Sequence, residues 1–349
     1  MVVERWRLGA LLVAMACFVL PSLVGLGVEA RADDELEEGS EQAVSSREEF
    51  RFTDPRITES SGLVVADGYF VTTNDSGDAG RIYTVDPATG DTVGTTTYAE
   101  EATDVEALAP AGNREVWVGD IGANAAPRRT VSVTKVPFGP DDETVDVPSY
   151  ELVYPDGRSR DAESLLVEPD TGRLLVLTKE VFGGALYRAP VELSEESPNR
   201  LERTGDQRLI GIATDAAFFD DGDHLVVRDY SRAVFYTWPD LEQIGEVVLP
   251  DQPQGEAIAV DADDRVHLST EGQDSPVLFI SLPEELRAAL DAPVRGNGPT
   301  IVETPEGFEP PEANDEQGLS LGPGRINWLV GGLLGIGVVV LLVRALRPR

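Results

Sequence analysis

The stretch TDVEALAPAGNREVWVGDIGAN, residues 103–124, has the pattern of a β-hairpin. An acidic start leads into an apolar strand, Gly112 and Asn113 supply a tight turn, and a second apolar strand ends at Asp120. Such a hairpin is half of one blade of a β-propeller, in which four-stranded sheets surround a central channel. The stretch therefore predicts a propeller, provided that its pattern recurs along the chain.

The pattern does recur. Its copies occupy residues 60–75, 104–120, 161–180, 213–229 and 254–271. Aligned positions in successive copies lie 41 to 57 residues apart, close to the roughly 40–50 residues of known propeller repeats. Each copy is followed by a third strand of aromatic and β-branched residues, and the first four also by a plausible fourth strand. An all-β propeller of five blades fits this spacing best, although a sixth could lie within the two longest steps.

The fifth copy lacks a fourth strand of its own. After Pro283 the sequence EELRAAL has helical character, whereas FRFTD, which starts at Phe50 ahead of the first copy, has strand character. We therefore predict that this N-terminal strand completes the last blade. Such closure removes the exposed edges of the ring.

Acidic residues dominate the composition. The chain has 63 Asp and Glu against 28 Lys and Arg, a formal net charge of -35. This charge repels nucleic acid, which we exclude as a partner. The sequence has two lysines, Lys135 and Lys179. Because lysine is rare in this chain, a lysine that lies near a candidate site is worth noting. The one cysteine, Cys17, lies in the apolar N-terminal run, so the fold is expected to depend on its core rather than on disulfides.

The N-terminal end has the features of a secretory signal, which we assign to residues 1–32. Arg5 and Arg7 precede an apolar run, and Ala30-Arg31-Ala32 supplies the small residues that signal peptidase requires. Residues 33–49 are acidic and poor in large apolar groups, which predicts a disordered leader before the propeller. The propeller itself is assigned to residues 50–290.

The C-terminal end predicts a membrane anchor. The apolar residues 326–343 would span roughly 27 Å as a helix, just enough to cross a bilayer. The basic tail, residues 344–349, then lies on the cytoplasmic side and the propeller outside. Residues 291–325, rich in Pro, Gly and acidic groups, read as an extended stalk. The chain is thus predicted to be a single-pass protein of the cell membrane with an extracytoplasmic propeller.

One mouth of the channel is expected to gather acids. The start of the first strand and the end of the second lie at the same edge of an antiparallel pair. We therefore expect Glu106, Glu163, Asp215 and Glu256, all at strand starts, to lie together as metal ligands. Carboxylate oxygens favour Ca²⁺, and a chain with only two histidines offers little to Zn²⁺.

The alternative is that no ion binds there. Two carboxylates about 6 Å apart repel by roughly 3 kcal/mol at an effective dielectric near 20. Lys179 and Arg228 would then neutralise the acids and join neighbouring blades. The sequence leaves both interpretations open.

The loop GDIGAN, residues 119–124, with two arginines after it, is the most distinctive in the chain. It either binds a ligand or only turns the chain. Together with the basic residues near the strand ends, it defines the candidate ligand-binding set of Asp120, Asn124, Arg128, Lys179 and Arg228. His224 and His267 lie on predicted strands and are expected to be packed side chains rather than bases, so no Ser-His-Asp triad is predicted.

The segments DVEALAP, VWVGDIGAN and YPDGRSRDAESLLVEPDTGRLLVLTK resemble exported bacterial β-propeller proteins of the phytase-like or esterase-like group, and more loosely propellers of the NHL and YVTN types. The resemblance covers roughly residues 55–285. It implies a secreted propeller with a Ca²⁺ site. Phytase propellers carry several lysines around dense calcium and phosphate sites, which this chain does not match.

These observations predict a membrane-anchored extracytoplasmic β-propeller that binds an unidentified small molecule or protein at an acidic channel mouth, without catalysis. One alternative is a Ca²⁺-dependent hydrolase of phosphoesters or other esters, with Glu106, Glu163 and Asp120 around the metal. A second alternative is a structural scaffold of the cell envelope.

Overall fold

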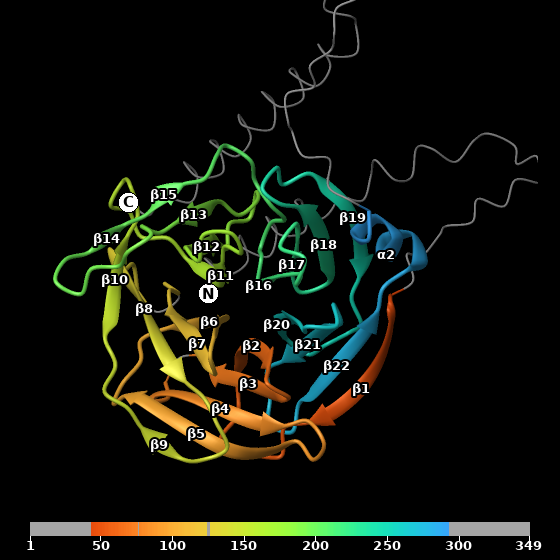
Figure 1. Cartoon of the computed structure of the whole chain (residues 1–349), viewed down its shortest axis with the longest axis horizontal. Helices are drawn as coiled ribbons and strands as arrows, with labels where there is room; N and C mark the ends of the chain where they lie inside the picture. Colours follow the sequence, from red (N-terminus) through yellow and green to blue (C-terminus); the bar gives the residue numbers. More distant parts are fainter. Residues whose placement is uncertain (1–42, 76, 124–125, 293–349) are drawn as a thin grey trace, which may run out of the picture. The chain divides into compact units, whose positions relative to one another are not determined.

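The computed structural model describes residues 43–75, 77–123 and 126–292. They form five sheets that surround a central channel, which is a five-bladed β-propeller (Figure 1). The predicted all-β class and the five blades are confirmed. The two longest repeat spacings hold long connections and short extra strands instead of a sixth blade.

Each blade runs outward from its innermost strand. Blade 1 contains β2 (Ser60–Ala66), β3 (Tyr69–Asn74), β4 (Gly80–Asp86), β5 (Asp91–Ala99) and the short β9 (Glu143–Thr144). Blade 2 contains β6 (Val105–Gly112), β7 (Glu115–Asp120), β8 (Thr130–Pro137), β10 (Ser149–Val153) and the short β14 (Asn199–Arg200). Blade 3 contains β11 (Ala162–Val167), β12 (Leu174–Thr178), β13 (Leu186–Arg188) and β15 (Glu202–Arg203).

Blades 4 and 5 complete the ring. Blade 4 contains β16 (Asp215–Phe218), β17 (His224–Arg228), β18 (Arg232–Thr237) and β19 (Gln243–Val248). Blade 5 contains β20 (Gly255–Val260), β21 (Val266–Thr270), β22 (Pro276–Ser281) and, as its outermost strand, β1 (Ser45–Arg51). Helix α2 (Glu284–Leu290) follows β22.

The predicted ring closure is confirmed, because β1 pairs antiparallel with β22. The strand begins at Ser45, however, so the last residues of the predicted leader are not disordered but paired. Glu49 reaches inward to within 2.7 Å of the His267 ring, and the Arg47 guanidinium lies 4.9 Å from the centre of the Phe279 ring. These polar residues can form a strand because β1 is an edge strand with little to bury.

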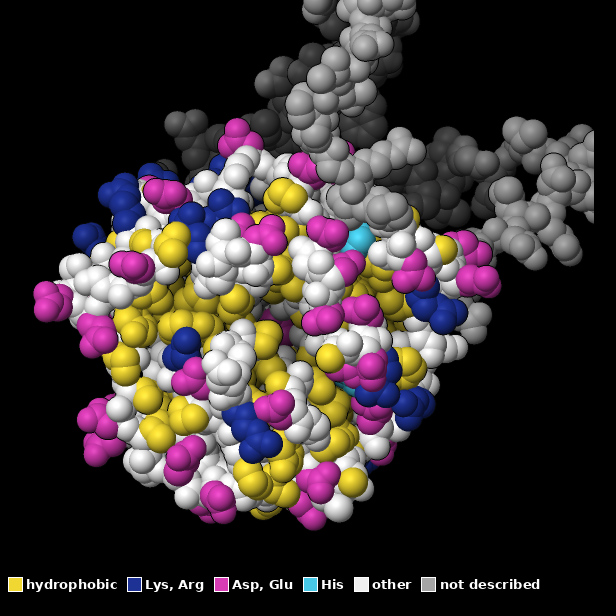
Figure 2. Space-filling view, viewed as in Figure 1, with side chains coloured by type: hydrophobic (Ala, Val, Ile, Leu, Met, Phe, Trp, Pro, Cys, Tyr) yellow, Lys and Arg dark blue, Asp and Glu magenta, His cyan; other side chains and the backbone are white. Residues whose placement is uncertain are grey.

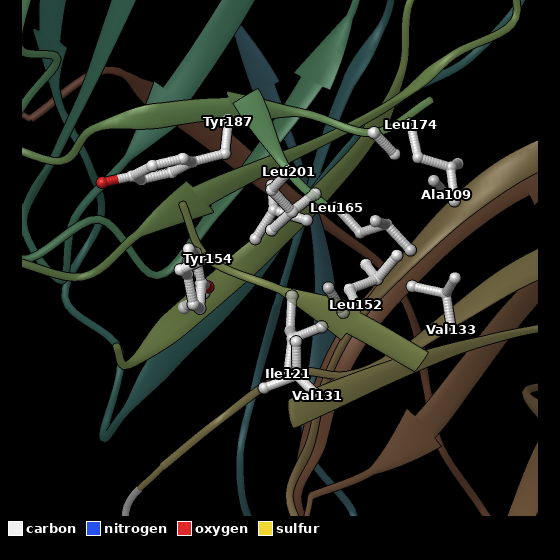
Figure 3. Close-up of a cluster of buried hydrophobic side chains, with 14 of the residues drawn as sticks. Ala109, Ile121, Val131, Val133, Leu152, Tyr154, Leu165, Leu174, Tyr187 and Leu201 are labelled. Carbon is white, nitrogen blue, oxygen red and sulfur yellow. The ribbon is translucent and has the colours of Figure 1, made fainter. Parts of the chain in front are cut away.

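Apolar side chains fill the space between neighbouring blades. Figure 3 shows one such cluster, between blades 2 and 3, where Leu152 and Leu165 are fully buried. The rings of Tyr154 and Tyr187 meet edge to face with their centres 5.0 Å apart. Each fully buried side chain of this size contributes about 1.5–3 kcal/mol to folding, so the ring is stable without disulfides.

The central channel is narrow and apolar beyond the strand starts. The inner strands enclose a cavity of about 60 Å³ lined by residues such as Leu63, Leu108, Leu166, Ala217 and Ile258. Figure 2 shows the hollow at the centre of the ring on one face of the molecule. The apolar lining gives the acids at the strand starts an environment of low polarity.

Among the described residues, no helix has the length and apolar character needed to cross a membrane. The predicted signal (1–32), the predicted span (326–343) and the basic tail (344–349) lie outside the described residues. So do residues 33–42 of the leader and residues 293–325 of the stalk.

Candidate functional site

A β-bulge recurs near the start of the innermost strand in four of the five blades. It falls at Ser61 in β2, Glu106 in β6, Glu163 in β11, and Glu256 with Ala257 in β20. A bulge places an extra residue on one strand and re-aims its side chain. The Ser61 hydroxyl thereby comes within 3.4 Å of the Glu106 carboxylate across the gap between blades 1 and 2.

Five carboxylates from three blades meet at this level of the channel. Glu106 belongs to two groups of three, one with Asp75 and Asp104 and the other with Asp161 and Glu163. Within each group, one oxygen of every carboxylate lies within 4.8 Å of the others. Asp104, Glu106 and Glu163 are all at least 97% buried. We call these five residues the acid cluster.

Burial and mutual repulsion raise the pKa values in the acid cluster. Burial is the largest cause of a rise in the pKa of Glu106 to about 10, and the charges of Glu163 and Asp75 add to it. Burial and the charge of Asp104 raise the pKa of Asp75 to about 7. At neutral pH the acid cluster therefore favours a bound proton or a bound cation over full ionisation.

The described part of the GDIGAN loop, residues 119–123, packs against the acid cluster. The amide of Gly122 donates to the Asp104 carbonyl at 3.1 Å, and the amide of Ala123 donates to the Asp161 carboxylate at 2.9 Å. A Cβ atom at position 122 would collide with the carboxylate oxygens of Glu106 and Asp104. Only glycine at this position therefore lets the backbone pack this closely against the two acids.

Asp120 and Arg128 hold this loop in place. The Asp120 carboxylate accepts the amides of Thr103 and Asp104 at 3.0 and 3.1 Å and pairs with the Arg128 guanidinium. Arg128 also donates to the Gly122 carbonyl at 3.2 Å. Two of the predicted ligand-binding residues thus position the loop. A third, Asn124, lies outside the described residues.

Lys179 joins the acid cluster from the end of β12. Its ammonium nitrogen lies 2.8 Å from Glu163 Oε1 and donates to the Tyr230 hydroxyl at 2.8 Å. Burial has the largest single effect and lowers the pKa of Lys179, but the charge and hydrogen bond of Glu163, with smaller effects of Tyr230 and Glu256, together raise it. Burial is also the main cause of a rise in the pKa of Glu163 to about 8, against the effect of Lys179. The predicted internal pairing is therefore present at Glu163.

The remaining predicted residues join blade 4 to blade 5. Arg228 is fully buried and donates to the Ala257 carbonyl at 3.0 Å, and Asp215 accepts the Ile258 amide at 2.9 Å. Glu256 accepts a hydrogen bond from Gln254 at 3.1 Å. Neither Asp215 nor Glu256 belongs to the groups of three acids. Only Glu106 and Glu163 of the four predicted metal ligands are brought together, and Arg228 presents no exposed surface to a ligand.

Three acids of the cluster were not in the predicted metal set: Asp75, Asp104 and Asp161. A signal for two of them was present, because Asp-x-Glu occurs at the same position in blades 2 and 3, as Asp104-Val105-Glu106 and Asp161-Ala162-Glu163. A prediction that takes a single acid from each blade misses the second acid of each Asp-x-Glu pair. Asp75 follows β3 and shows no comparable pattern.

The acid cluster suits a hard cation. Oxygens that bind one Ca²⁺ ion at about 2.4 Å lie no more than about 4.8 Å apart, which is the spread within each group of three acids. One oxygen of Asp75 is buried and has no hydrogen-bond partner among the described residues. These oxygen donors fit Ca²⁺ better than Zn²⁺, which prefers nitrogen and sulfur.

No protein-family model matches the chain, and no curated protein sequence is similar to it. Several solved structures are similar to it at low identity. A glucose dehydrogenase is 11% identical with a TM-score of 0.44, over 68% of this chain and 100% of that one. A gluconolactonase from Xanthomonas campestris is 14% identical with a TM-score of 0.40, over 68% of this chain and 80% of that one.

A streptogramin B lyase is 13% identical with a TM-score of 0.39, over 69% of this chain and 98% of that one. At such low identity these similarities concern the fold alone and transfer no activity. The predicted resemblance to β-propeller repeat proteins is confirmed at the level of the fold, which rests on the five sheets and their order around the channel.

Proposed function

We propose that the protein is a cation-binding β-propeller whose acid cluster holds Ca²⁺ and which acts as a binding module rather than as a catalyst. The observation that carries this proposal is the sharing of Glu106 between two groups of closely spaced carboxylates from three blades. Asp75, Asp104, Glu106 and Asp161 would supply the ligands, while Lys179 holds Glu163 beside them.

Charge balance supports the proposal. Two carboxylates about 4.8 Å apart repel by about 3.5 kcal/mol at an effective dielectric near 20. Lys179 offsets part of this repulsion, at Glu163. A divalent ion offsets it at the point where the acids converge, and the Gly122 loop would limit access of water to the ion.

We further propose that residues 1–32 export the protein and that residues 326–343 anchor it in the cell membrane with the propeller outside. Extracellular modules bind Ca²⁺ with dissociation constants of about 10⁻⁴–10⁻³ M, and a site of that affinity would suit this location. Hydrolysis of an ester or phosphoester is the alternative use of such an ion, and turnover on ester and phosphate panels separates it from binding alone.

Calcium titration of the full-length protein in detergent tests the proposal. Glu106→Gln removes the carboxylate shared by both groups and should weaken Ca²⁺ binding by about 100-fold or more. Glu202→Gln removes an exposed acid of β15, outside the acid cluster, and should leave binding within about twofold, since effects of substitution follow local contacts. A wild-type protein that neither binds Ca²⁺ by calorimetry nor changes its melting temperature with EDTA would refute the metal site.

A further inference from the structure

Four apolar side chains are exposed next to the acid cluster. Phe182 is 96% exposed and Val181 69%, both in the loop between β12 and β13. Ile212 is 39% exposed and Tyr230 40%. Scattered apolar residues are normal on a protein surface, whereas a group of them points to an interaction site. We call these four residues the apolar ledge.

Backbone contacts hold the apolar ledge together. The Ile212 amide donates to the Glu180 carbonyl at 3.0 Å. A Cβ atom at Gly211 would lie 2.5 Å from the Val181 carbonyl oxygen, so only glycine allows the two loops to approach this closely. The loop of blade 3 and the segment that leads into blade 4 therefore present their apolar side chains as one surface.

A single residue connects the apolar ledge to the acid cluster. Lys179 donates to the Tyr230 hydroxyl and pairs with Glu163, both at 2.8 Å. A molecule that lies on the apolar ledge thus lies beside the channel mouth, where Asp75 and Asp161 are the half-buried members of the acid cluster.

The backbone of the apolar ledge is strained at one residue. Ile212 has a φ of +56°, in the left-handed region that β-branched residues avoid. Residues held in such conformations concentrate at binding and switch sites. An exposed isoleucine gains little from burial here, so its retention in a strained conformation favours a role in recognition.

We propose that the apolar ledge and the acid cluster together dock a basic segment of a partner polypeptide, with its apolar side chains on the apolar ledge and a lysine or arginine toward the carboxylates. Charge selects this occupant. A net charge of -35 repels a second copy of the chain and anionic lipid, and attracts a basic segment. The proposal rests on the proposed function in its use of the acid cluster as a cation site, so Ca²⁺ and the basic side chain compete for the same carboxylates and peptide binding is measured in EDTA.

Fluorescence anisotropy with the full-length protein at 150 mM salt tests this inference. The probe is a labelled ten-residue peptide in which Lys alternates with Leu and Phe. The double variant Val181→Ser/Phe182→Ser should bind this peptide about tenfold more weakly than wild type, because apolar area is lost from the interface. The matched control is Val191→Ser, which removes an equally exposed valine, 69%, from another loop, and it should bind like wild type.

A twin peptide with Glu in place of Lys should also bind about tenfold more weakly than the basic one. Equal affinities of the double variant and the control, or of the two peptides, would overturn the inference. The double variant should keep the Ca²⁺ affinity of wild type. A protein that binds the peptide but not Ca²⁺ would therefore refute the metal site alone, and the converse would refute the docking surface alone.

Discussion

Glu106 shows how one side chain can depend on several blades at once. The bulge in β6 aims it toward the channel, Ser61 approaches it from blade 1, and Glu163 faces it from blade 3. The loop above it has no side chain at Gly122. The close approach of the loop backbone to the carboxylate therefore depends on the absence of a methyl group at this position.

Gly122→Ala tests the close packing of the loop backbone against the carboxylates. The added Cβ would displace Glu106 and Asp104, so Ca²⁺ affinity should fall at least about tenfold, and overpacking should lower the free energy of unfolding by about 1–3 kcal/mol. Calorimetric Ca²⁺ titration and urea denaturation measure the two effects. The control is Gly205→Ala, where no atom lies within 4 Å of the new Cβ, and wild-type affinity of Gly122→Ala would contradict the site.

Arg228 is a second residue whose role depends on burial. Its guanidinium is fully buried and bonds mainly to backbone carbonyls of blades 4 and 5 and to Gln252. Arg228→Ala should lower the free energy of unfolding by about 3–5 kcal/mol, because the charge anchors two blades and its loss leaves buried carbonyls without donors. Urea denaturation measures this. Arg200→Ala, at an exposed position, should change stability by less than about 0.5 kcal/mol.

At the scale of elements, β1 decides whether the ring closes. It is the outermost strand of blade 5 although it comes first in the chain. Phe50 anchors it in the core, with its ring 4.9 Å from that of Phe70. The rest of the strand is mostly polar and exposed, so its place depends on backbone pairing with β22 and on this anchor.

Phe50→Ala should lower the free energy of unfolding by about 3–5 kcal/mol, as expected for a buried phenylalanine. It should also raise hydrogen exchange along β22, because the pairing strand is lost. Phe182→Ala removes an exposed phenylalanine and serves as the control. Unchanged exchange in β22 would show that closure does not depend on this anchor.

Elements also show what the sequence could predict. Alternating apolar strands and glycine turns favoured five blades over six, because each inner strand needs an apolar face. The start of β1 escaped prediction because an edge strand such as Ser45–Glu49 can be polar and still pair. The acid cluster was only half predicted. The prediction took one acid from each repeat and assumed that all of them face the channel alike. β16, however, pairs in regular register without the bulge, so the Asp215 carboxylate is buried and accepts the amides of Ala216 and Ile258.

At the scale of the molecule, stability should depend on pH through the acid cluster. The folded protein raises the pKa of Asp75 to about 7, of Glu163 to about 8 and of Glu106 to about 10. Above the ordinary range near pH 4 the folded state thus binds more protons than the unfolded state, so the free energy of unfolding falls as pH rises.

Without Ca²⁺, the melting temperature should therefore fall between about pH 5 and pH 8, and further toward pH 10. Saturating Ca²⁺ should reduce that fall, because the ion replaces the protons. Thermal melts across this range, with EDTA or with Ca²⁺, measure both effects. Glu106→Gln should flatten the profile in EDTA, and a profile that rises with pH would contradict the assignment.

Closure by β1 has a mechanical consequence. In blade 5, β22 lies between β21 and β1, and the chain leaves it through α2 toward the proposed anchor. A pull on that end would load β22, whose hydrogen bonds to β21 and β1 hold it on both sides. β22, the last strand before α2, is thus paired on both sides. The first described strand of the propeller, β1, stabilises the last one.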